Sequence, residues 1–147
     1  MSYIEFLAEQ AGRERIAVTP ELDAALTELD AAFEELAPAL AVEYVGPGVG
    51  VEGAEDVYRL VIRPHEWVMG APSWSLKICD ALPNAGWRVA WAVQGASRAR
   101  KSMCVKALPQ LLRGYVEAVR AAGKADTEAG QRLAALAEQF EQVCPAP

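Results

Sequence analysis

Two runs of alternating apolar and polar residues, on either side of a turn sequence, constrain the fold of this 147-residue chain most strongly. The turn, residues 83–86, reads Pro-Asn-Ala-Gly, and such residues commonly connect adjacent antiparallel strands. Because side chains on a strand alternate between its two faces, the runs predict a hairpin with one apolar face. That face is predicted to hold Trp74, Leu76, Ile78, Trp87, Val89, Trp91 and Val93.

The apolar face of this hairpin requires a cover. It carries three of the four tryptophans of the chain, and each tryptophan can bury roughly 150–250 Å². The opposite face is small or polar, so we expect it to stay solvated or to line a shallow groove. Its residues are Ser75, Lys77, Cys79, Arg88, Ala90, Ala92 and Gln94.

Further strand and helix patterns surround the hairpin. Strands are predicted near residues 40–45 and 55–63, in addition to those near 74–80 and 86–94. Four adjacent strands with short links favour an antiparallel meander. The apolar stripes of helices that begin near residues 20 and 102 would cover its tryptophan face. The expected fold class is therefore α+β, as one globular domain over residues 1–147, with N- and C-terminal helices flanking the sheet.

Polar residues and prolines predict where these helices begin and end. Ser2 and Glu5 have the spacing of a capping box, and Thr19 precedes a proline at a first helical position. Ser102 and Asp126 are the predicted N-caps of the last two helices. Pro38 is expected to end the second helix. Pro109 is expected to kink the third, because the apolar stripe runs through it in phase.

Charge is sorted along the chain, whose net charge is −6. Residues 1–50 carry ten acidic and two basic side chains, whereas residues 98–124 carry seven basic side chains and one acidic side chain. Such sorting indicates either that the two segments face each other or that each offers a surface of one sign to a partner.

The acidic side of the helix after Thr19 is the predicted partner surface. No basic residue occurs between residues 19 and 46, so like charges on this helix repel each other unless something compensates for them. The simpler interpretation is a helix face exposed to solvent. The more specific interpretation is a surface that binds a basic partner. The predicted partner-binding residues are Glu21, Glu28, Asp30, Glu34 and Glu35.

A basic cluster near residues 98–106 is the alternative site. Helix N-termini favour anions, so a phosphate or sulfate could bind there. A solvated loop, or ion pairs to the acidic helix, would explain the same residues. The predicted anion-binding residues are Arg88, Arg98, Arg100 and Lys101, with Lys106 close by.

No catalytic, metal or cofactor site is predicted. His65 is the only histidine, which removes metal sites built on several histidines. Cys79 and His65 could form a nucleophile and base only if the fold brought them together. Residues 48–53 match the dinucleotide pattern G-x-G-x-x-G, but a strand rather than a helix is predicted after them, so we reject a cofactor there.

These patterns favour a small acidic protein-binding module, such as an inhibitor, adaptor or regulator, that acts without catalysis. The alternative is a protein that binds a small molecule or phosphate, or an enzyme, with its site at residues 98–106. A basic protein or a second copy of this chain would be the partner. Nucleic acid is disfavoured by the acidic balance. The sequence shows neither a membrane span nor a signal peptide, and its three cysteines fit reduced thiols, so a cytoplasmic location is expected.

Overall fold

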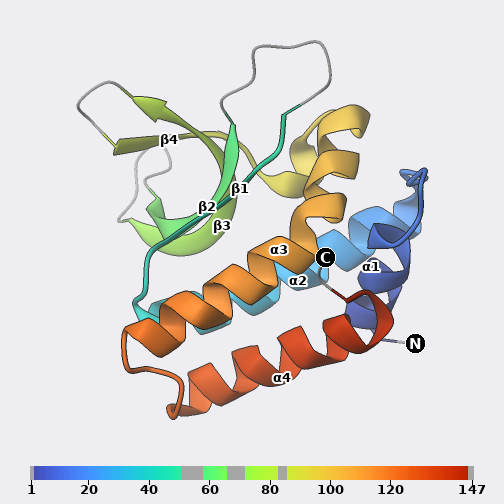
Figure 1. Ribbon diagram of the computed structural model, residues 1–147. Coiled ribbons are helices and arrows are strands. Elements are labelled where there is room, and N and C mark those ends of the chain that lie inside the picture. Colours follow the sequence, from blue (N-terminus) through green and yellow to red (C-terminus); the bar gives the residue numbers. More distant parts are fainter. Residues whose placement is uncertain (1, 51–57, 66–71, 83–85, 146–147) are drawn as a thin grey trace.

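A four-stranded antiparallel sheet lies against a layer of helices in the computed structural model, which describes residues 2–50, 58–65, 72–82 and 86–145 (Figure 1). The strands follow the chain in the order β1-β2-β3-β4, so the predicted α+β meander is confirmed. The elements are α1 Tyr3–Ala11, α2 Pro20–Leu40, β1 Tyr44–Gly48, β2 Arg59–His65, β3 Ser73–Leu82, β4 Gly86–Trp91, a 3₁₀ turn at Val93–Gly95, α3 Arg98–Ala121 and α4 Glu128–Val143.

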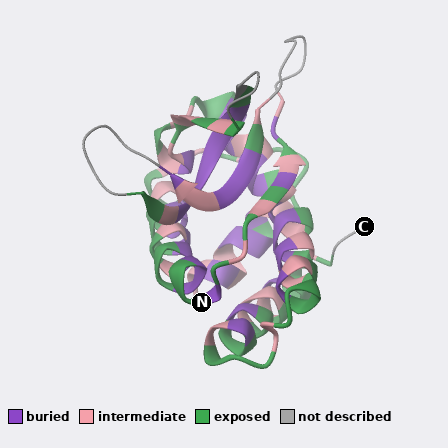
Figure 2. Cartoon of the chain, turned by 90° about the vertical axis from the view of Figure 1, so that its left-hand side faces the viewer, coloured by how far each residue is buried: buried purple, intermediate pink, exposed green. Residues whose placement is uncertain are grey.

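The helices α2 and α3 cover the sheet, as predicted. The helix α2 packs against β3, and α3 packs against β1. The remaining helices, α1 and α4, contact each other and both of the covering helices. Buried side chains therefore concentrate between the sheet and the helices (Figure 2). This core includes Leu26, Leu29 and Phe33 of α2, Leu60, Ile62, Leu76 and Ile78 of the sheet, and Val105, Leu108, Leu112 and Tyr115 of α3.

Trp74, Trp87 and Trp91 are not fully buried, although Trp74 packs against this core, so the prediction of one buried tryptophan face is wrong. The pairing of β3 with β4 shifts between Ile78 and Cys79, which places Ile78 opposite Trp91 but Cys79 opposite Val89. A bulge of this kind sends the side chains on its two sides to different faces. Trp91 stays 36% exposed, and Trp74 and Trp87 are only half-buried.

The polar face of the hairpin also differs from its prediction. Ser75, Lys77 and Cys79 are buried in the structure rather than solvated. Figure 1 shows that the sheet curls strongly along β2 and β3. The central strand β3 is therefore buried on both faces. The sequence prediction assumes that its side chains alternate between core and solvent. Residues 83–85 of the turn predicted at 83–86 lie outside the described residues, and Gly86 begins β4.

Helix N-termini follow simple capping chemistry. The hydroxyl oxygens of Ser2, Thr19 and Ser97 accept hydrogen bonds from backbone amides of the first turns of α1, α2 and α3, and such caps typically stabilise a helix by about 1 kcal/mol. The predicted cap Ser102 is wrong, because α3 begins five residues earlier. The predicted cap Asp126 is displaced by its neighbour Thr127, whose side chain accepts from Gly130 N.

Two helices contain an internal proline. Pro38 does not end α2, which continues to Leu40, so the predicted first strand at 40–45 begins only at Tyr44. Leu40 is fully buried and extends the apolar stripe of α2, and this packing outweighs the backbone hydrogen bond that proline cannot donate. The helix α3 continues through Pro109 and changes direction near its middle, as the predicted kink requires (Figure 1).

Candidate functional site

The helix α2 carries most of its acidic residues in two rows, an outer row and a row that faces the sheet. Residues seven positions apart lie on nearly the same side of a helix. Glu21, Glu28 and Glu35 form one row at this spacing. Asp23 and Asp30 form a second row on the side that faces the sheet, which α2 contacts through β3.

Lysines neutralise the row that faces the sheet. The Lys101 ammonium lies 2.6 Å from Asp23 Oδ1. The ammonium of Lys77 lies 3.8 Å from Asp30 Oδ2, and the amide of Gln94 donates a hydrogen bond to the same oxygen. Both lysine side chains are at most 8% exposed. The predicted partner residue Asp30 therefore belongs to an internal polar contact, which argues against its availability to a partner.

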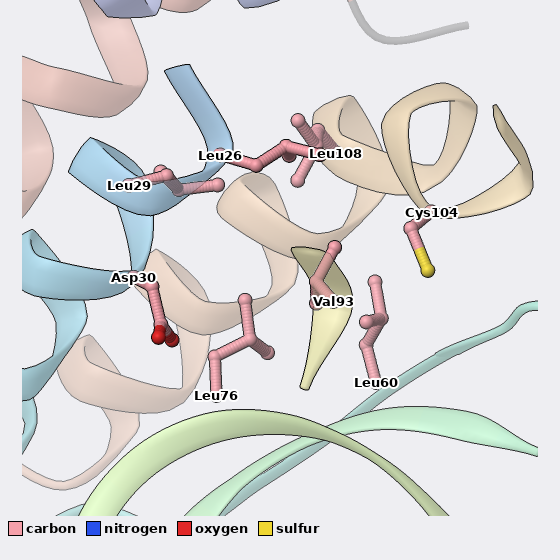
Figure 3. Close-up of a pocket in the computed structure, with 8 residues that line it drawn as sticks. All are labelled: Leu26, Leu29, Asp30, Leu60, Leu76, Val93, Cys104 and Leu108. Carbon is pink, nitrogen blue, oxygen red and sulfur yellow. The ribbon is translucent and has the colours of Figure 1, made fainter. Parts of the chain in front are cut away.

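A small cavity beside Asp30 has no room for a ligand. Its volume is about 10 Å³, which is the space of one water molecule. The Asp30 carboxylate points from α2 toward the sheet, and Leu76 lies beside it (Figure 3). The remaining lining residues are Leu26, Leu29, Leu60, Leu76, Val93, Cys104 and Leu108.

The outer row of α2 is neutralised at one end only. Glu35 accepts a hydrogen bond from the Arg132 guanidinium of α4 at 2.9 Å, and this contact lowers the pKa of the Glu35 carboxyl. Glu21, Glu28 and Glu34 are exposed and form no ion pair with any residue that the structure describes. We call these three residues the acidic strip; Glu21 and Glu28 belong to the outer row, whereas Glu34 lies about 120° around the helix from Glu28, on the side of Asp23 and Asp30.

A shallow hollow adjoins the acidic strip at Glu34. It lies between the C-terminal half of α2 and the start of β3, and its volume is about 410 Å³. Trp74 provides an aromatic wall, and Pro38 and Pro72 provide aliphatic ones, while Glu34 and Ser73 supply the polar groups. Sequence reasoning missed this hollow, because the alternation pattern placed Trp74 in the core.

The predicted anion-binding residues do not converge on one point. Arg88 of β4 donates two hydrogen bonds to Asp80, at 3.1 and 2.6 Å, which raise the pKa of Arg88 and lower that of Asp80. Lys101 pairs with Asp23. Arg98 is exposed at the first position of α3. These side chains therefore lie at different places in the fold and do not form one anion site.

Arg100 is turned inward and serves the sheet. Its Nη1 donates a hydrogen bond to Val49 O at 2.8 Å. Its guanidinium carbon lies 4.7 Å from the ring centroid of Tyr58 and 5.2 Å from that of Trp91. Stacking of a guanidinium on aromatic faces is a stabilising arrangement, and the residue as a whole is buried.

Cys79 and His65 are held apart by the register of β2 and β3. His65 pairs with Ser73, whereas Cys79 pairs with Arg59. Ser73 and Cys79 are six positions apart along β3, or about 20 Å at about 3.3 Å per residue. Burial also raises the pKa of the Cys79 thiol to about 12, so the thiolate is not available near neutral pH. The nucleophile and base considered from the sequence therefore do not meet.

The described residues also show no cluster of three or more His, Cys, Asp or Glu side chains that could hold a metal ion. No helix in this part of the chain is long and apolar enough to cross a membrane. Comparisons with protein-family models, with curated proteins and with solved structures give no match to the chain.

Proposed function

We propose that this protein is a protein-binding module, an inhibitor, adaptor or regulator that acts through surface contacts without catalysis. The proposed contact surface is the acidic strip of α2. The expected partner offers a basic surface, either on another protein or on a second copy of the chain.

One observation carries the proposal: the fold neutralises some acids of α2 and leaves the acidic strip uncompensated. Asp23, Asp30 and Glu35 each receive a cation from another element. The acidic strip receives none from the described residues, although the chain places seven basic side chains in residues 98–124. Uncompensated acidic side chains present a negative surface, which attracts a basic partner.

The geometry around the reactive side chains supports a function without catalysis. Cys79 and His65 lie at different positions of the sheet and do not assist each other. Asp80 is occupied by Arg88. A general acid or base must reach its substrate, and these groups are held by structural contacts instead.

An anion site at residues 98–106 has weaker support. Lys101 and Arg100 are occupied by Asp23, by Val49 O and by two aromatic rings, and Lys106 donates a hydrogen bond to Glu14 O. Arg98 at the start of α3 is the remaining exposed basic residue of this segment's first turn. A single arginine beside a helix N-terminus is a weak ligand set.

Affinity copurification with the tagged chain tests the proposal first. We expect one stoichiometric protein partner. The variant Glu28→Lys with Glu34→Lys should then abolish the interaction, because both residues are exposed and the partner surface is basic. Glu21 is left unchanged, since an acidic residue in the first turn stabilises the helix itself.

A matched control reverses two acids elsewhere, Glu9→Lys on α1 with Glu138→Lys on α4, both of which are exposed. The control should fold normally and retain the partner. If the α2 variant retains the partner as well, the acidic strip is not the interface. If no protein partner is recovered, and a nucleotide or phosphorylated metabolite raises the melting temperature, the anion-binding alternative replaces this proposal. A ligand at 100 times its Kd adds about 2.7 kcal/mol of stability.

A further inference from the structure

The hollow at Glu34 and Trp74 combines a carboxylate, an indole and two proline rings. Its volume of about 410 Å³ contrasts with about 10 Å³ for the cavity beside Asp30 and about 20 Å³ for a crevice between α3 and α4. It is therefore large enough for a side chain of a second molecule, whereas those two are not.

Glu34 and Trp74 of the hollow have no cationic partner among the described residues. Glu34 forms no ion pair with any described residue. Trp74 is half-buried and has no cation stacked on its ring among these residues. An aromatic face next to a carboxylate attracts a cation through the ring quadrupole and through its charge.

A guanidinium already stacks on aromatic rings elsewhere in this protein. Arg100 stacks on Tyr58 and Trp91 and directs a guanidinium N–H to a backbone oxygen. A planar guanidinium can stack and donate in its own plane at once, which the ammonium of lysine cannot do. Carboxylates also accept guanidinium groups through two parallel hydrogen bonds.

We propose that the hollow between Glu34 and Trp74 receives an arginine side chain of a basic partner protein. The guanidinium stacks on the Trp74 indole and donates to the Glu34 carboxylate, while its aliphatic stem contacts Pro38 and Pro72. This inference rests on the proposed function and names the chemistry of its contact.

The acidic strip supports a peptide segment rather than an isolated cation. Glu28 lies six residues before Glu34, about 9 Å along the helix axis and about 120° around it, so a partner that contacts both must wrap around α2. A second basic side chain of the same partner segment can reach Glu28 while the first occupies the hollow. The excess of acidic residues in the first fifty residues of the chain favours the approach of such a segment.

Titration of the isotope-labelled protein with a short capped peptide that has arginine at alternate positions tests the inference. The readout is the indole N–H resonance of Trp74, which is assigned by its loss in Trp74→Phe. We expect this resonance to move and to saturate. The lysine form of the peptide should bind several-fold more weakly, and the citrulline form, which is neutral but of similar shape, should not move it.

Glu34→Gln should lower the affinity for the arginine peptide by about tenfold, because a charge-assisted hydrogen bond is lost. Glu138→Gln is the matched control, because it removes one exposed acid from α4, and it should change the affinity less than about twofold, as a distant surface charge would. Both residues are exposed, so neither variant should unfold the protein. A thermal melt of each variant checks this point.

Three outcomes would overturn the inference: an unmoved Trp74 resonance, equal affinity for the arginine and lysine peptides, or an unchanged affinity in Glu34→Gln. The proposed function can fail separately. If the copurified partner depends on Glu28 and Glu34 but tolerates both Glu34→Gln and Trp74→Phe, the function stands and the arginine site is wrong. If the peptide saturates the hollow but no protein partner exists, the arginine site stands and the function is wrong.

Discussion

Arg100 joins parts of the sheet that are far apart in the sequence. Val49 follows β1, Tyr58 precedes β2, and Trp91 ends β4, and the Arg100 side chain contacts all three. The two rings also contact each other, with centroids 4.9 Å apart. One side chain of α3 thereby holds one rim of the sheet in place.

Arg100→Met should therefore destabilise the protein by about 2–3 kcal/mol, because a carbonyl loses its charged donor and two rings lose a stacked cation. Urea unfolding measures the loss. Arg98→Met on the same helix is the control and should cost less than about 0.5 kcal/mol, since Arg98 is exposed. Equal losses in the two variants would show that the stacking contributes nothing.

Gly114 allows α3 to approach β1 closely. A Cβ atom at this position would overlap the Tyr44 hydroxyl oxygen. Gly114→Ala should therefore destabilise the protein by about 1–3 kcal/mol, the usual range for overpacking. The loss should be smaller in the Tyr44→Phe background, which lacks that oxygen. Gly95→Ala, where a Cβ meets no atom within 4 Å, should be nearly neutral in the same thermal melts.

His65 should make the stability depend on pH. Burial lowers the pKa of His65, and the positive charges of Arg63 and Lys77 act in the same direction. As pH falls below about 6.5, the unfolded chain takes up a proton that the folded protein does not. The free energy of unfolding should therefore decrease as pH falls from about 6.5 toward 5.

Urea unfolding at several pH values measures this slope, and His65→Gln should flatten it. The carboxyls of Asp80 and Glu35 have lowered pKa values, so their contributions are lost only at lower pH. A slope that is unchanged in His65→Gln would assign the pH dependence to other groups.

Asp23 and Lys101 join α2 to α3, and removing one of these side chains should destabilise the protein more than removing the other. The Lys101 side chain is only 8% exposed, whereas that of Asp23 is 46% exposed. Asp23→Ala leaves a buried ammonium unpaired and should cost about 1–3 kcal/mol, whereas Lys101→Met removes the charge and should cost less. Glu21→Ala is the control for the loss of an acid in the first turn. If Lys101→Met costs more than Asp23→Ala, the aliphatic stem of the lysine matters more than its charge.

The sequence predicted most elements of the fold, since local chemistry determines them. The cap residues Ser2 and Thr19 and the apolar stripe of α2 act within one or two turns of helix. The end of α2 and the faces of β4 could not be predicted in this way. Leu40 is buried by contacts to other elements, and the bulge opposite Cys79 depends on how β3 and β4 pair.

The candidate site was predicted in part. Charge counting identified α2 as the acidic helix, but it could not show which acids face cations. Asp30 and Glu34 are four residues apart, yet one is paired with Lys77 inside the protein and the other is exposed at the hollow. That difference comes from the position of β3, which is distant in the sequence.

At the scale of the whole molecule, basic side chains of the sheet and of the other helices neutralise several acidic side chains of α2. Lys77 of β3, Lys101 of α3 and Arg132 of α4 all reach α2. Of the acidic strip that remains, Glu21 and Glu28 lie in the outer row of the same helix, and Glu34 lies at the hollow beside β3. A partner that bound there would therefore dock on a helix that also packs against α1, α4 and β3.

The first and last helices complete one layer, since α1 packs against α4. The Gln139 amide of α4 donates hydrogen bonds to Ser2 Oγ and Glu5 Oε1, each at 3.0 Å. During synthesis on a ribosome, residues 2–5 leave the exit tunnel long before residue 139 is added. The sheet, whose strands are neighbours in the chain, can form in the meantime. We expect α1 to form these last contacts only after α4 has been synthesised.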